Sequence, residues 1–235
     1  FDDAIGIYTN EKGEKTISIY ITNVVLWLNV LNLWSSFSKR VSTIYLPDRK
    51  RPMLPSILSD NICSLKENEI RYALTLDISI DSNDNVGEYN FTNTKVKLFK
   101  NYRYEEPSLL EDVDYVEMLR IVSNMNNVKG QNYVEHMTDS HDMVSYLMIL
   151  MNYYSSQNLM QHENGIFRSL KFGENDNTIP SNLDKSFGIF SPSSSSIVVI
   201  LTPSANIKSF IYPGSSILMC CRTITSIILM QVLIT

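Results

Sequence analysis

The segment from Tyr45 to Arg71 is the feature of this sequence that most constrains the fold. It contains Pro47, Pro52 and Pro55, and each proline fixes φ at about −65° and lacks a backbone N–H donor. An ordinary α-helix and a central β-strand are therefore both excluded over this stretch. We expect a stiff loop between strands that presents its side chains outward.

This loop carries an aromatic side chain beside a basic cluster. Tyr45 is followed within a few residues by Arg49, Lys50 and Arg51. An exposed ring offers a flat face on which a nucleobase can stack, and nearby cations can contact phosphates. The combination predicts a surface for the end of a single-stranded nucleic acid. A tyrosine packed under the loop, and charges that are merely solvated, are the alternatives.

Alternation of apolar and polar residues predicts two antiparallel hairpins, because a period of two is typical of half-buried strands. Each hairpin is closed by residues that favour turns. The first hairpin comprises residues 4–8 and 16–22 around a turn at 11–13, and the second comprises residues 71–80, a turn at 81–85 and a return strand with Val96 and Leu98.

Helical patterns follow the strands. Ser108 and Glu111 are spaced as a capping box and predict a helix to about Asn124. Ser140 is a candidate N-cap for a second helix with a broad, methionine-rich apolar face. Residues 24–37 form either a helix or a loop followed by a helix. Strands first and helices later predict an α+β fold, in which helices pack on an antiparallel hairpin sheet.

The formal net charge of −5 limits how a nucleic-acid surface could work here. Proteins that hold nucleic acid by overall electrostatics need clustered lysine and arginine in excess. This chain has 20 basic and 25 acidic residues, so any RNA affinity must be local. Its three cysteines form neither a metal-binding spacing nor a disulfide framework, which predicts the cytoplasm or another reducing intracellular compartment.

The composition changes after residue 184, because Lys185–Thr235 contains no aspartate or glutamate. We therefore expect a folded domain at residues 1–184 and a divergent or aberrant hydrophobic tail at residues 185–235. A membrane span needs about 20 consecutive apolar residues. No span is expected in the tail, where prolines and basic residues interrupt every such window. A structural protein anchored to a membrane by this tail is the alternative.

Seven segments stand in an order that is itself informative: FDDA at 1–4, TISIYITNV at 16–24, TIYLP at 43–47, RPMLP at 51–55, LSDNICSLKENEIRYALT at 58–75, DSHDMVSYLMILMN at 139–152 and GIFR at 165–168. Through them the chain resembles the RNB catalytic domain of ribonuclease II and ribonuclease R type exoribonucleases. The resemblance implies an RNB-domain-like fold and 3′-to-5′ hydrolysis of single-stranded RNA to nucleoside 5′-monophosphates with Mg²⁺.

The resemblance also assigns candidate site residues. Asp2 and Asp3 match the last two acids of the family motif Asp-x-Asp-Asp, which makes them the catalytic and metal-binding candidates. Carboxylate oxygens are the ligands that Mg²⁺ prefers, although a solvated strand start is the alternative for such a pair. Tyr45 matches the family tyrosine that stacks near the RNA 3′ end. The RNA-binding candidates are Tyr45, Arg49, Lys50 and Arg51.

Several departures from the family pattern predict impaired catalysis. Phe1 occupies the x position of the acidic motif, so two family carboxylates have no counterpart in this sequence. Asn23 replaces a family aspartate, and the later Ser-Pro-Ile-Arg-Arg segment has no match. We expect the isolated chain to be inactive or nearly so, and the alternative function is an inactive RNB-like module that binds RNA or a protein. For Arg71 and Glu69, which match family positions, we expect a structural salt bridge.

Overall fold

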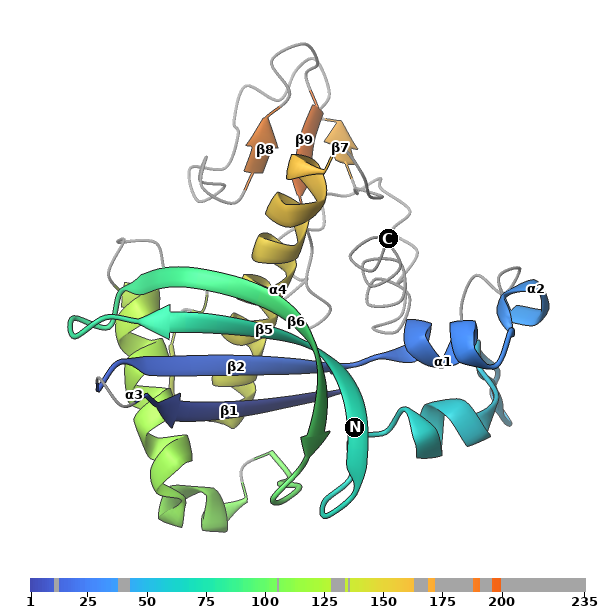
Figure 1. Cartoon of the computed structure of the whole chain (residues 1–235), viewed down its shortest axis with the longest axis horizontal. Coiled ribbons are helices and arrows are strands. Elements are labelled where there is room, and N and C mark those ends of the chain that lie inside the picture. The colour runs from blue at the N-terminus through green and yellow to red at the C-terminus, as the bar shows by residue number, and fades with distance from the viewer. Residues whose placement is uncertain are drawn as a thin grey trace.

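A four-stranded antiparallel sheet forms the centre of the computed structural model (Figure 1). The structure describes residues 1–10, 13–37, 43–104, 106–127, 134, 136–162, 169–171, 188–190 and 196–199. The strands are β1 (Asp3–Thr9), β2 (Lys15–Thr22), β5 (Ile70–Ile80) and β6 (Val86–Lys97), in the order β1-β2-β5-β6. Both predicted hairpins, β1–β2 and β5–β6, are confirmed.

The alternating pattern explains why the sheet has a buried face. Ile17, Ile19 and Ile21 of β2 stand opposite buried residues of β5 in the ladder, and cross-strand partners share a face. Helices α3 (Val113–Asn127) and α4 (Ser140–Gln161) cover this face and complete the main core (Figure 1). The fold is therefore α+β, as the order of the elements predicts.

The predicted capping box of Ser108 and Glu111 is wrong. Both residues lie in a short 3-10 helix, η2 (Pro107–Glu111), which precedes α3. Asp112 takes the capping position, since its carboxylate accepts two backbone N–H groups of the first turn of α3 at 3.0 and 3.2 Å. Aspartate is as good an N-cap as serine, and its negative charge is also favourable next to the positive helix end.

The N-cap of α4 lies one residue earlier than predicted. Asp139 accepts a hydrogen bond from the backbone N–H of Asp142 at 2.9 Å, and Ser140 is the first residue of the helix. Asp142 lies in the first turn, where its charge is favourable.

A second, smaller core lies beyond one end of the sheet. Its buried members are Val24, Leu28, Met53, Leu54, Leu58 and Cys63, and we call it the side core. The elements around it are α1 (Val24–Val30), α2 (Trp34–Phe37), the strands β3 (Ile44–Tyr45) and β4 (Lys50–Arg51), and the π-helical turn η1 (Ile57–Ile62). Figure 1 shows α1 and α2 on the side of the sheet where the N-terminus lies. The proline-rich segment thus contains a short two-stranded hairpin and a helical turn.

A three-stranded antiparallel sheet follows α4 along the chain. Its strands are β7 (Ser169–Lys171), β8 (Gly188–Phe190) and β9 (Ser196–Val199), in the order β7-β9-β8. The GIFR motif at 165–168 and most of residues 185–235 lie outside the described residues. The division of the chain at residue 184 therefore stays a prediction. Within the described ranges, no helix combines the length and the apolar character that a membrane crossing requires.

Candidate RNA-binding site

Backbone hydrogen bonds hold the acidic N-terminal segment between β2 and the loop that follows η1. The carbonyl of Phe1 accepts from the backbone N–H of Leu65 at 2.8 Å, and the carbonyl of Asp2 accepts from that of Thr22 at 3.0 Å. Asp3 opens β1 opposite Ile21. The two aspartates therefore stand at a fixed place, at the end of the sheet next to the side core.

The two carboxylates project to different sides. Successive residues of a strand point to opposite faces, and Asp3 shares the face of its buried ladder partner Ile21. Asp2 lies on the side of Cys63. Burial raises the pKa of the Cys63 thiol to about 11, and the negative charge of Asp2 adds to that increase. Asp2 is therefore the acid that lies toward the side core.

The β3–β4 hairpin presents Tyr45 outward. The backbone N–H of Leu46 donates to the carbonyl of Arg49 at 2.8 Å and closes the turn, and Tyr45 is 71% exposed. Packing of this ring under the loop is thus excluded. Lys50 stands opposite Tyr45 in the ladder, so the ring and the ammonium group share one face of the hairpin.

The three basic residues of the hairpin are exposed. Arg49 has an ion pair with the adjacent Asp48 at 3.8 Å, with both side chains mostly in solvent. Such a pair contributes little, because water screens it. Arg51 stands opposite Ile44 on the other face from Tyr45 and Lys50. The cations of the hairpin therefore lie on both of its faces.

The side core connects the hairpin to the acidic segment. Met53 and Leu54 follow β4 directly and pack in the same cluster as Cys63. The backbone N–H of Met53 also donates to the Thr43 hydroxyl at 3.1 Å, which ties the residue after the hairpin to the residue before it. The β3–β4 hairpin and the segment that carries Asp2 are therefore both attached to the side core.

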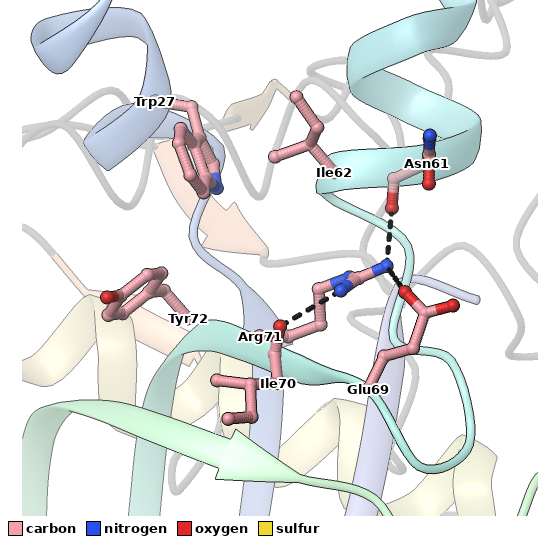
Figure 2. Close-up of a pocket in the computed structure, with 7 residues that line it drawn as sticks. All are labelled: Trp27, Asn61, Ile62, Glu69, Ile70, Arg71 and Tyr72. Carbon is pink, nitrogen blue, oxygen red and sulfur yellow. Dashed lines mark hydrogen bonds and ion pairs between the residues drawn. The ribbon is translucent and has the colours of Figure 1, made fainter.

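Arg71 has a structural role beside the side core, and it forms the predicted salt bridge with Glu69. Its guanidinium donates to the carbonyl of Ser64 at 2.8 Å and to that of Asn61 at 3.2 Å, and it forms an ion pair with Glu69 (Figure 2). These bonds fix the loop after η1 to the start of β5. The guanidinium is thus committed to the protein and is not a free phosphate ligand.

The Asn23 side chain uses both its oxygen and its amide group in hydrogen bonds. The side chain is 2% exposed, and its Oδ1 accepts from the backbone N–H of Leu26 at 2.9 Å, which caps α1. Its amide group donates to Oδ1 of Asn93 at 2.8 Å. An amide therefore serves as a cap at this position, where it joins α1 to β6.

Sequence reasoning missed a pocket at the beginning of β5. It has a volume of about 310 Å³ and contains an aromatic pair, Trp27 and Tyr72, whose ring centroids lie 6.0 Å apart with planes at 69°. Figure 2 shows the two rings on one side and Arg71 with Glu69 on the other. The alternating pattern placed Tyr72 on the apolar face of a strand, and no sequence signal indicates that this end of the strand extends past the main core.

Within the part of the chain that the structure describes, no three His, Cys, Asp or Glu side chains gather as a metal-binding group. Asp2 and Asp3 have the right donor chemistry for a hard cation. Magnesium is usually held by one or two carboxylates together with substrate phosphates and water. Because the two carboxylates project to different sides, only one of them, such as that of Asp2, fits a site that is completed by a bound nucleic acid.

Residues 1–113, just under half of the chain, match the family model of the RNB domain. Ribonuclease R of Chlamydia muridarum is 27% identical over 142 residues, which are 55% of this chain and 20% of that protein. The chain thus spans about a fifth of the length of this relative.

Solved structures share the fold. Mycoplasma genitalium RNase R in complex with double-stranded RNA has a TM-score of 0.58 and 19% identity, over 72% of this chain and 36% of that chain. Yeast Ssd1, described as a pseudonuclease, has a TM-score of 0.55 and 11% identity, over 72% of this chain and 25% of that chain. At these identities the likeness concerns the fold alone, and it extends to both a ribonuclease and a pseudonuclease.

Proposed function

We propose that this chain is the RNB part of an exoribonuclease that removes nucleotides from the 3′ end of single-stranded RNA. The observation that carries the proposal is the shared anchoring of Asp2 and the Tyr45 hairpin on the side core. An aromatic platform for a terminal base and a carboxylate that could hold a cation for its phosphate are thus built on one unit. The match of residues 1–113 to the RNB domain model supports the same conclusion.

Tyr45 and its neighbours bind the RNA in this proposal. The exposed ring stacks on a base near the 3′ end, which is worth about 1 to 3 kcal/mol per base and tolerates any sequence. Lys50 lies on the same face as the ring, where its ammonium group contacts an adjacent phosphate. Arg49 and Arg51 add cationic contacts around the turn and on the other face.

Asp2 supplies the carboxylate of the reaction centre that lies toward the side core, and Asp3 adds a second carboxylate on the other side of the strand. A bound Mg²⁺ would activate a water molecule and neutralise charge on the scissile phosphate. The water oxygen forms the new bond to phosphorus, and the bond from phosphorus to O3′ of the preceding nucleotide breaks. O3′ takes up a proton, and the terminal nucleotide leaves with a 5′-phosphate. Asp2 would hold the cation at the sheet end, and Tyr45 would keep the terminal base from moving.

We further propose that the 235-residue chain hydrolyses RNA slowly or not at all by itself. Among the described residues, no third side chain joins Asp2 and Asp3 as a possible metal ligand. The sequence also has no counterpart of the family segment with two arginines, and loss of such a cationic clamp typically costs several kcal/mol of transition-state stabilisation.

An inactive RNB-like module that binds RNA or a protein is the second candidate function. The same incomplete ligand set favours it. Residual cleavage distinguishes the two candidates. An impaired exoribonuclease should keep slow cleavage that depends on the aspartates, whereas a binding module should have none.

The test is a time course with 5′-labelled single-stranded RNA and Mg²⁺, together with a binding measurement on the same RNA. The matched control is the double variant Asp2→Asn/Asp3→Asn, which keeps size and polarity. We expect RNA binding in both proteins and slow shortening from the 3′ end only in the unchanged chain. Absence of RNA binding would contradict the proposal, and binding without any shortening would favour the inactive module. Rapid shortening of the RNA would contradict only the proposal that the chain is slow or inactive, and it would leave the proposed exoribonuclease function intact.

A further inference from the structure

The pocket that contains Trp27 and Tyr72 has features of a nucleotide site rather than of core packing. Tyr72 is 40% exposed and Ile70 is 53% exposed, although both belong to the clearest strand of the sequence. Trp27 is half-buried on α1 and meets Tyr72 edge to face. An aromatic wall, drawn in Figure 2, is thus partly open to solvent at the beginning of β5.

Two lysines flank this wall. Lys95 stands opposite Tyr72 in the β5–β6 ladder, and Lys97 stands opposite Ile70. Cross-strand partners share a face and lie about 5 Å apart at their Cβ atoms, so both lysines project from the face of the sheet that carries Tyr72 and Ile70. Both lysines are exposed, and no described acidic side chain forms an ion pair with either of them.

The charged groups inside the pocket, Arg71 and Glu69, already have partners within the protein. Arg71 bonds to carbonyls of Ser64 and Asn61, and its charge is matched by Glu69. The uncompensated charge at the pocket is therefore that of the flanking lysines. An occupant should accordingly offer a flat face to Tyr72 and negative charge to the lysines, and a nucleotide of a single strand has both.

Local bonds place the pocket next to the acidic segment. Leu65 donates to the carbonyl of Phe1, and the preceding residue, Ser64, accepts the bond from Arg71. The acidic segment and the pocket are therefore attached to adjacent residues of one loop, which places them near each other. A volume of about 310 Å³ is at the low end for small-ligand sites, which suits a single nucleotide.

We propose that Trp27, Tyr72, Lys95 and Lys97 form a second RNA contact that holds a nucleotide upstream of the 3′ end. This inference rests on the proposed function, because it concerns how the same RNA is held. Tyr72 supplies the stacking face, Trp27 supports it edge to face, and the lysines bind the phosphates of the passing backbone.

The experiment measures the affinity of the full 235-residue chain for single-stranded RNA of about 20 nucleotides at several salt concentrations. Tyr72→Ala should weaken binding about 5- to 100-fold because one base no longer stacks, and Tyr72→Phe should bind like the unchanged chain because it keeps the ring. Tyr8→Ala is the matched control, since Tyr8 is an exposed tyrosine on β1, and it should have no effect.

The lysines give an independent readout that a folding defect cannot imitate. Lys95→Gln/Lys97→Gln removes two exposed charges and should reduce the slope of log K against log salt by about 1.4, because each neutralised phosphate of a single strand accounts for about 0.7 of that slope. An unchanged slope together with unchanged affinity of Tyr72→Ala would overturn the second RNA contact.

A further variant separates this inference from the proposed function. If Tyr45→Ala binds RNA more weakly while the Tyr72 and lysine variants do not, the second RNA contact is wrong and the proposed function stands. If the unchanged chain binds no RNA, both are wrong. If the variants of both sites weaken binding independently, both are supported.

Discussion

Tyr45 and Lys50 stand directly opposite each other in the two-residue ladder of β3 and β4, so that an exposed ring and an exposed ammonium group occupy one face of a small hairpin. Pro47 lies in the turn that closes this hairpin and restricts its backbone. A surface that is rigid before binding loses little entropy when RNA binds.

Replacement of Tyr45 tests whether this face binds RNA. Tyr45→Ala should weaken the binding of single-stranded RNA by about 1 to 3 kcal/mol, because one base no longer has a ring on which to stack. Fluorescence anisotropy with a labelled oligonucleotide measures the change, and Tyr8→Ala serves as the control at another exposed tyrosine. Equal affinities of Tyr45→Ala and the unchanged chain would exclude an RNA-binding role for the hairpin.

A charge network between the β5–β6 turn and α3 should make stability depend on pH. Arg120 bonds to Asp84 at 2.7 Å and to Glu117, and Glu117 also pairs with Lys15. Hydrogen bonds from Arg120 and then Lys15 lower the pKa of Glu117 from 4.5 to about 2, and Arg120 also lowers the pKa of Asp84. These folded-state pKa values lie below the unfolded ones. The stabilisation is therefore complete above about pH 5 and is lost as the pH falls toward 2.

Urea denaturation of the unchanged chain and of Arg120→Met at neutral and acidic pH measures this contribution. At neutral pH the variant should be less stable by about 0.5 to 1 kcal/mol, a modest value because the side chains are partly exposed. The difference should shrink as the pH approaches 3. A difference that stays constant over this range would show that the network does not produce the pH dependence.

The sequence predicts the central sheet well because each strand carries its own signal. Alternation in β2 and β5 follows from one buried face, and it needs no knowledge of distant residues. The salt bridge of Arg71 with Glu69 is also local in sequence. The caps failed because serine and aspartate compete for the same position, and only the structure shows that Asp112 and Asp139 accept the backbone bonds.

The candidate site depends on contacts that local patterns do not contain. Asp2 and Asp3 are adjacent in the sequence, yet strand alternation separates their carboxylates, and the position of Cys63 shows which one lies toward the side core. Trp27 and Tyr72 are far apart in the sequence and meet through the packing of α1 against the start of β5. Neither relationship has a periodic signal.

Asn23 should be more important for stability than its polarity suggests. Asn23→Ala removes the cap of α1 and leaves the part-buried N–H of Leu26 without its partner, so it should destabilise the protein by about 1 to 2 kcal/mol. Asn23→Asp keeps the accepting oxygen and should cost less, although it loses the donor to Asn93. Urea denaturation of both variants measures the order, and an alanine variant as stable as the unchanged chain would contradict the role of the cap.

Cys63 should resist alkylation in the folded protein. Burial is the main cause that raises the pKa of its thiol from 9.0 to about 11, so its thiolate fraction near pH 8 is about 100-fold below that of an ordinary cysteine. Treatment with iodoacetamide, followed by mass spectrometry of the Cys63 peptide, should give slow labelling in buffer and fast labelling in urea. Equal rates in the two conditions would mean that the side core is open to solvent.

Photo-crosslinking of the RNA terminus tests the central claim most directly. A single-stranded RNA carries one photoreactive nucleotide, either at its 3′ end or at its 5′ end, and mass spectrometry identifies the crosslinked peptide. The account predicts that the 3′-terminal nucleotide crosslinks to the β3–β4 hairpin around Tyr45, and that the 5′-terminal nucleotide does not. Crosslinks from the 3′ end that avoid residues 44–51, or that match those from the 5′ end, would contradict it.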